Sequence, residues 1–274
     1  MPSLARNLFA IFTLIVCGIS VAGAEHNYPG GVVELEFKKQ TQELPDIRFG
    51  LYEPVIIELK RHWRVLIGID LDTLPGEYVV YFRRNTETSR DEFTTIKVRH
   101  HPTLTELIDG IEPTQTDISA PIRNYQSWSE IDFSNTQQPS LPLQLPVEGG
   151  WSETFGKQLV DAKSGALTSV NAVSFTTTEF ANVTSPQSAI VSRVITTEDG
   201  ISTVFLDHGR GLYSMIEGIG DLTVAAGNGV NAGAVLGKVP VSNNNSDNEP
   251  RTIVWQTRLN HALVNPFVLT QLKP

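Results

Sequence analysis

The chain has 274 residues, of which 40% are hydrophobic and 19% are charged, and its formal net charge at pH 7 is −9. This length is sufficient to bury one large or two modest hydrophobic cores. The acidic balance, without any run of basic residues, argues against a protein that binds nucleic acid or an anionic membrane.

The first 24 residues are typical of a cleaved secretory signal peptide. Arg6 supplies a positive start, residues 8–19 form an apolar run too short to span a bilayer, and residues 22–24 are the small residues that a signal peptidase needs. Cys17 is the only cysteine and would leave with this signal, so the mature chain would form no disulfide. We expect an exported, periplasmic protein that begins at Glu25 and has no transmembrane span after cleavage. A retained N-terminal anchor is the alternative.

Residues 25–101 predict a small antiparallel β domain. Segments that alternate apolar and polar residues, or that are rich in β-branched residues, predict strands at 32–37, 54–59, 63–70, 77–82 and 93–98. The dipeptide Pro75-Gly76 predicts a turn between two of them. Short strands separated by turns in this way are typical of a β-sandwich.

Residues 102–144 predict a linker that drapes over its neighbours. Prolines recur in this region among glutamine, serine and threonine, a composition that disfavours a packed core. Residues 104–111 could form one or two helical turns. We expect Trp128 and Phe133 to dock on the surface of a domain.

From residue 145 onward the β pattern returns. Strands are predicted at 189–195, 202–207, 211–216, 234–239 and 253–259. Glycines separate these segments, and the polar residues 242–249 predict a loop.

Four segments of this C-terminal region follow one another in a characteristic order. They are LPVEGGWSETFG at 145–156, VFLDHGRGLYSM at 204–215, a spaced set of valines and glycines at 224–237, and VNPF at 264–267. In this order they resemble the LytM/lysostaphin-type zinc metallopeptidase family, which cleaves peptidoglycan. Residues 63–78 are similar to the immunoglobulin-like module that precedes many of these peptidases.

The resemblance implies a mainly β protein with two domains. We expect a signal peptide at 1–24, an immunoglobulin-like β-sandwich at 25–101, a linker rich in Pro, Ser and Gln at 102–144, and a degenerate LytM-type antiparallel β domain of the duplicated-hybrid-motif kind at 145–274.

The resemblance also implies where a zinc site would lie. Active members bind zinc through the His and Asp of an HxxxD motif and the second His of an HxH motif, while the first His of HxH and a His beside the central hairpin act in catalysis. The matching positions, in chain order, hold Val170, Ser174, Gly218, Thr252 and Val254. A shifted alignment places Lys163 and Leu167 at the HxxxD positions instead.

None of these residues is a good zinc ligand. Zinc in proteins takes nitrogen, sulfur or carboxylate oxygen donors, whereas valine and glycine side chains have no donor and serine and threonine offer neutral hydroxyls. We therefore expect no zinc cofactor and no catalytic residue. We expect a remnant groove that is small and apolar, suited to a protein contact or simply filled in, formed by Val170, Ser174, Gly218, Thr252, Val254 and Trp255.

Other candidate sites have structural explanations. Asp207, His208 and Gly209 form the hairpin motif, which we interpret as setting a turn. His100 and His101 are adjacent, and neighbours on a strand face opposite ways, so a shared metal is not expected. The glycine-rich residues 227–233 predict a hairpin turn rather than a phosphate loop, because no βαβ unit surrounds them.

The resemblance to degenerate members implies a non-catalytic envelope protein, a pseudopeptidase, that regulates or scaffolds a peptidoglycan hydrolase. Its partner would be a cell-wall amidase or an active LytM-type endopeptidase, with peptidoglycan as a further candidate. Two alternatives stay open. One is a zinc-dependent endopeptidase with atypical ligands drawn from Asp161, Asp207, His208 and His261. The other is a peptidoglycan-binding module.

Overall fold

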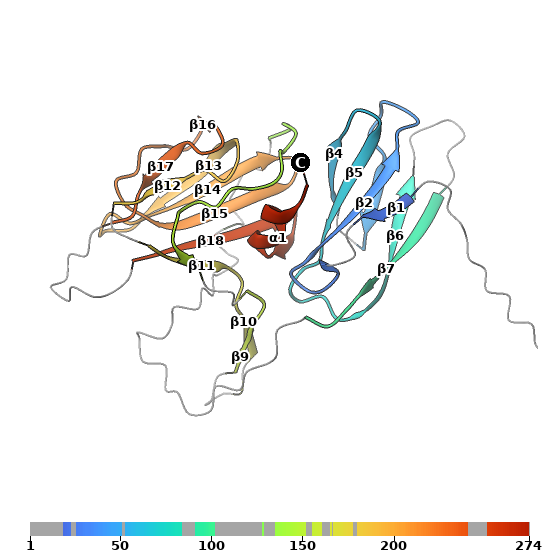
Figure 1. Ribbon diagram of the computed structural model, residues 1–274, viewed down its shortest axis with the longest axis horizontal. Helices are drawn as coiled ribbons and strands as arrows, with labels where there is room; N and C mark the ends of the chain where they lie inside the picture. The colour runs from blue at the N-terminus through green and yellow to red at the C-terminus, as the bar shows by residue number, and fades with distance from the viewer. Residues whose placement is uncertain are drawn as a thin grey trace, which may run out of the picture.

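The computed structural model describes residues 19–22, 26–50, 53–83, 91–101, 128, 135–151, 155–160, 165, 167–177, 180–240 and 251–273. This part of the chain is almost entirely β structure, with one short helix, α1 (Pro266–Gln271). It builds two antiparallel β units that lie side by side, with α1 and the C-terminus between them (Figure 1). The predicted mainly β class is confirmed. Among the described residues, no helix is long and apolar enough to cross a membrane.

The first unit is a sandwich of two sheets. One sheet has the order β1-β2-β5-β4 and the other the order β3-β6-β7. The strands are β1 (Ile19–Ala22), β2 (Val32–Lys38), β3 (Asp46–Phe49), β4 (Val55–Glu58), β5 (His62–Gly68), β6 (Gly76–Arg83) and β7 (Asp91–Val98). The inward residues of both sheets form one core around Trp63, Val65 and Phe82. On β5 the outward residues are buried too, and Leu66 joins the core cluster of the second unit. An immunoglobulin-like topology for this unit stays a prediction.

Strand β1 falls inside the segment that the sequence predicts as a signal peptide. It pairs antiparallel with β2, so that Ile19 lies opposite Phe37 and Ala22 opposite Glu34. Cleavage after Ala24 would remove β1 and leave β2 at the edge of its sheet.

The second unit is built on an eight-stranded sheet. Its order is β16-β13-β14-β15-β18-β11-β8, with β19 also paired to β18. The strands are β8 (Gly150–Trp151), β11 (Val173–Thr177), β13 (Ala189–Thr196), β14 (Ser202–Gly209), β15 (Leu212–Ile219), β16 (Gly229–Val230), β18 (Arg251–Leu259) and β19 (Ala262–Val264). Two small ribbons accompany it, one made by β9 (Gln158–Val160) and β10 (Leu167–Ser169), the other by β12 (Asn182–Thr184) and β17 (Val235–Lys238).

The two faces of this sheet differ. Because side chains alternate along a strand, one face carries Phe175, Ile216 and Trp255 into the main hydrophobic core, where α1 adds Val268 and Leu269. The other face is covered by a smaller cluster of Trp128, Phe205, Tyr213 and Met215, with Ile195 at its margin. The predicted docking of Trp128 is confirmed, and Phe133 lies outside the described residues.

The two units pack closely against each other. Gly68 at the end of β5 faces the β18–β19 turn, where a Cβ atom on it would lie only 2.8 Å from the Ala262 Cβ. The buried Arg64 pairs with Glu34 at 2.6 Å and donates a hydrogen bond to the backbone oxygen of Lys273. Asp70 accepts a hydrogen bond from the Leu263 amide at 2.9 Å. These contacts hold the C-terminal residues of the second unit against the first.

Candidate functional site

Two of the three metal positions implied by the family resemblance, Ser174 and Val254, lie together on the face that Trp128 partly covers. Ser174 on β11 lies directly opposite Val254 on β18, and Val254 lies opposite Glu217 on β15. Residues opposite each other on neighbouring strands point to the same face, so these three side chains form one row across the sheet. Both Ser174 and Val254 are buried. Thr252 continues the same face one step along β18, opposite Thr176.

Gly218 sits at an irregularity of β15. The pairing of β14 with β15 skips it, because Thr203 lies opposite Glu217 and Ser202 opposite Ile219. Its φ is +96°, and an ideal Cβ would lie 2.6 Å from the Thr252 carbonyl oxygen. The family resemblance implies a catalytic histidine at this position in active members. Here the backbone of the neighbouring strand occupies the space that a side chain would need.

Val170 lies beside the turn at Phe155 and Gly156 rather than within the strand row. Its carbonyl accepts from the Gly156 amide at 2.7 Å, its own amide donates to the Lys157 carbonyl at 2.8 Å, and its side chain is fully buried. Lys163, from the shifted alignment, lies outside the described residues, and Leu167 is in β10.

Trp255 does not line the groove, which corrects the expectation from its place in the sequence. It follows Val254 directly and therefore points to the opposite face. Its ring is fully buried beside Phe175, with centroids 6.3 Å apart, and its Nε1 donates to the Ser214 Oγ at 3.2 Å.

The donor set in this row does not fit zinc. Val254 offers only methyl groups and Ser174 a neutral hydroxyl, which leaves the Glu217 carboxylate as the single suitable donor of the row. A catalytic zinc needs about three nitrogen, sulfur or carboxylate ligands from the protein. Within the described part of the chain, no three histidine, cysteine, aspartate or glutamate side chains are grouped so that they could hold a metal ion. No chemical step through a metal can be built on the residues of this row.

The most elaborate contacts on this face surround Trp128. Its ring meets Phe205 edge-on, at 5.3 Å between centroids and 86°, and its Nε1 donates to the Gln256 Oε1 at 2.6 Å. The Arg258 guanidinium lies 5.3 Å from the centre of the indole. Since Gln256 is two residues from Val254, Trp128 lies on the same face, one row from the metal positions that the family resemblance implies.

Asp207 and Gly209 hold the chain that follows Trp128. The buried Asp207 accepts hydrogen bonds from the Gly209 amide at 2.8 Å and from the Asn135 amide at 3.3 Å. A Cβ on Gly209 would collide with the Gln137 carbonyl oxygen, at 2.1 Å. The Asp-His-Gly hairpin motif thus also anchors the end of the segment predicted as a linker. The sequence alone does not reveal this contact, because the two partners are about 70 residues apart.

His208 is a fully buried, neutral link in a polar chain. Its Nε2 lies 2.9 Å from the Ser214 Oγ, and its Nδ1 lies 3.1 Å from the Ser188 carbonyl oxygen. Burial lowers the pKa of His208 to about 4. The neutral imidazole can donate from Nδ1 to the carbonyl and accept at Nε2 from the hydroxyl. Asp207 and His208 are neighbours on β14 and point to opposite faces, so they cannot share a metal.

The other residues considered as atypical ligands are dispersed. His261 is exposed in the turn between β18 and β19, and Asp161 lies outside the described residues. Among the described residues, His261 is not grouped with Asp207 or His208 as a ligand set.

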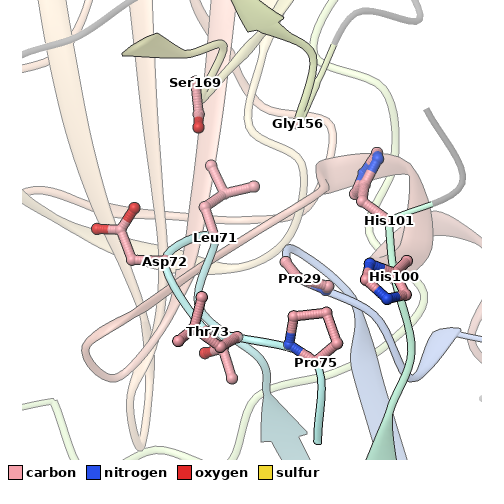
Figure 2. Close-up of a pocket in the computed structure, with 10 residues that line it drawn as sticks. Pro29, Leu71, Asp72, Thr73, Pro75, His100, His101, Gly156 and Ser169 are labelled. Atoms are coloured by element: carbon pink, nitrogen blue, oxygen red, sulfur yellow. The ribbon is translucent and has the colours of Figure 1, made fainter. Parts of the chain in front are cut away.

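A separate cavity of about 360 Å³ lies between the two units. His100, His101, Gly156 and Ser169 line it together with the loop that carries Leu71 (Figure 2). Both histidines reach this cavity because β7 ends at Val98, so the alternation expected for a strand does not apply to them. Burial lowers the pKa of His101.

Comparisons with known proteins show the fold. No protein-family model matches the chain, and no curated protein matches it. A crystal structure from Pseudomonas aeruginosa, described as an M23 peptidase, is 23% identical, with a TM-score of 0.62 over 89% of this chain and 95% of that one. Helicobacter pylori Csd3 gives 10% identity and a TM-score of 0.42 over 88% of this chain and 70% of that one. Lysostaphin gives 15% identity and a TM-score of 0.30 over 36% and 39%. The likeness to the Pseudomonas structure confirms the LytM-type fold that the sequence predicts, and its coverage includes both β units.

Proposed function

We propose that this chain, which has the fold of M23 peptidases, is a non-catalytic protein of the cell envelope that regulates or scaffolds a peptidoglycan hydrolase. The hydrolase would be a cell-wall amidase or an active peptidase of the same fold. The predicted signal peptide supports a periplasmic or otherwise exported location.

The side chains at the implied ligand positions, Ser174 and Val254 in particular, carry this proposal. Zinc lowers the pKa of its bound water and polarises the peptide carbonyl, and both effects require the ion to be held at this place. The side chains at the ligand positions have no suitable donors, and Gly218 leaves no room for the catalytic histidine. A scaffold that keeps its sheet and both units while losing these groups is suited to binding rather than hydrolysis.

The surface chemistry of the face also favours a protein contact. Its floor combines aromatic, methionine and buried amide side chains with two arginines, Arg193 and Arg258, on the rim. Such a mixture of aromatic residues, Met and Arg is typical of protein–protein interfaces. Trp128 already covers part of this face.

Reconstitution with a hydrolase tests this function. The mature protein, immobilised and exposed to envelope extract, is expected to retain a cell-wall amidase or M23 peptidase, and the purified pair is then incubated with purified sacculi. The rate of muropeptide release by the hydrolase should change by roughly fivefold or more, at the lower end of typical coupling between two binding events. The protein alone should release nothing. The heat-unfolded protein is the control, and failure of every retained hydrolase to change its rate would refute the regulatory role.

A further inference from the structure

We propose that the pocket filled by Trp128 is a binding site for tryptophan-bearing peptide segments, at which a partner protein competes with Trp128. This inference deepens the proposed function, because it assigns the kind of partner segment that the non-catalytic face accepts. We call the pocket, formed by Phe205, Tyr213, Met215, Gln256 and Arg258, the indole pocket.

The indole pocket matches each part of the ring that fills it. Phe205 and Tyr213 contact the ring at centroid distances of 5.3 and 6.5 Å, and Arg258 lies over its face. Trp128 is 3% exposed, so nearly the whole side chain is enclosed. Aromatic rings packed at these distances and a cation over an indole are both favourable arrangements.

A buried amide gives the pocket its selectivity for tryptophan. Gln256 is 1% exposed, and its Nε2 donates to the Asn171 carbonyl at 3.0 Å. This bond fixes the amide so that Oε1 accepts the indole N–H at 2.6 Å. A phenylalanine in the pocket would leave that buried acceptor without the indole donor, and buried polar groups that lose a partner are strongly disfavoured.

Trp128, which fills the indole pocket, belongs to none of the strands of the sheet. It belongs to the stretch of sequence that joins the two β units, and Asn135 of the same stretch contacts the hairpin at Asp207. A partner that docks on the row of Ser174 and Val254 must either displace Trp128 or leave the adjoining pocket covered. A partner with its own tryptophan restores every contact that Trp128 gives up.

Charge indicates what surrounds the partner's tryptophan. Arg193 on β13 lies opposite Phe205 on β14, and the Arg258 guanidinium lies over the Trp128 ring. Two cations therefore flank the pocket. In the chain itself, Glu130 and Asp132 follow Trp128 closely. We therefore expect the partner segment to carry acidic residues next to its tryptophan.

Peptide binding tests the indole pocket directly. The probe is a fluorescent synthetic peptide with the sequence of residues 123–134, RNYQSWSEIDFS. Trp128→Ala should bind it at least about tenfold more tightly than the wild type, because removing the competitor in the same chain frees the pocket. A peptide with alanine in place of the tryptophan should bind neither protein, and Gln256→Met in the Trp128→Ala background should weaken binding about tenfold.

Oxidation of Met215 gives an independent readout. Met215 is the only methionine besides Met1, and it is buried in the indole pocket. Hydrogen peroxide should oxidise it slowly in the wild type, faster in Trp128→Ala, and slowly again when the peptide is added. Trp128→Phe keeps the ring and serves where the alanine variant fails to fold; its oxidation rate should lie between the two.

Three results would overturn the proposal. They are equal peptide affinity for the wild type and Trp128→Ala, binding that does not depend on the peptide's tryptophan, and a dimer by light scattering in which Trp128 fills the pocket of a second copy. All measurements use this protein and the peptide alone. Their outcome therefore tests the indole pocket independently of whether the protein regulates a hydrolase.

Discussion

Replacing Gly218 with histidine, the residue that the family resemblance implies here in active members, is expected to lower the free energy of unfolding by about 3 kcal/mol or more. Two causes add together. The φ of +96° is unfavourable for any residue with a side chain, and the new Cβ would lie 2.6 Å from the Thr252 carbonyl oxygen. The strands β15 and β18 would have to separate, because the colliding atom belongs to the backbone. Urea unfolding followed by circular dichroism measures the loss.

A matched pair of alanine variants separates these two causes. Gly227 has a similar φ of +87°, but a Cβ there would meet nothing within 4 Å. Gly227→Ala should therefore cost about 1 kcal/mol from backbone strain alone, and Gly218→Ala clearly more. Equal costs for the two variants would show that β15 and β18 can separate freely. The position would then be open to a catalytic side chain after all.

Acidification from pH 7 to pH 4 is expected to remove about 3 kcal/mol of stability through His208 alone. Burial lowers its folded-state pKa to about 4, from an ordinary value of 6.5. The unfolded chain therefore binds a proton at this histidine below pH 6.5, while the folded chain binds one only near pH 4. The stabilisation is fully present above pH 6.5 and is lost as the pH falls through this window.

The variant His208→Gln isolates this effect. Glutamine is neutral throughout and can still donate to the Ser188 carbonyl or accept from Ser214. Between pH 7 and pH 4, the free energy of unfolding of the variant should fall by about 3 kcal/mol less than that of the wild type. This difference does not depend on the variant's stability at pH 7. Parallel curves for the two proteins would mean that His208 is protonated, or accessible to water, in the folded state.

Most long strands could be predicted from the sequence, because their two-residue alternation is a local property. The segments 32–37 and 202–207 match β2 and β14 to within two residues at their ends. Shorter strands cannot be predicted in this way. Strand β3 (Asp46–Phe49) has too few residues to display a period.

The sequence contains a start signal for helix α1. Asn265 caps it by accepting from the Phe267 amide, and Pro266 occupies its first turn. Asparagine followed by proline is a typical helix start. Taken only as part of the closing family segment, this dipeptide predicts no helix.

The candidate site shows what a sequence pattern omits. The spacing placed Ser174 and Val254 in one groove, and the strand register sets them opposite each other. The same pattern included Trp255, although strand alternation turns its side chain into the core. The contacts of Trp128 with Phe205 and Gln256 join segments about 80 and 128 residues away. Without an alignment, no sequence signal connects them.

The measurement that tests the account most directly is the amount of zinc that the purified mature protein retains. The protein is incubated with excess Zn²⁺, passed through a gel-filtration column and analysed for metal, beside an active M23 peptidase treated in the same way. With valine and serine at the ligand positions, we predict less than about one-tenth of an equivalent of zinc per chain, against about one equivalent for the active peptidase. Retention of about one equivalent by this protein, together with muropeptide release that a chelator abolishes, would contradict the non-catalytic assignment.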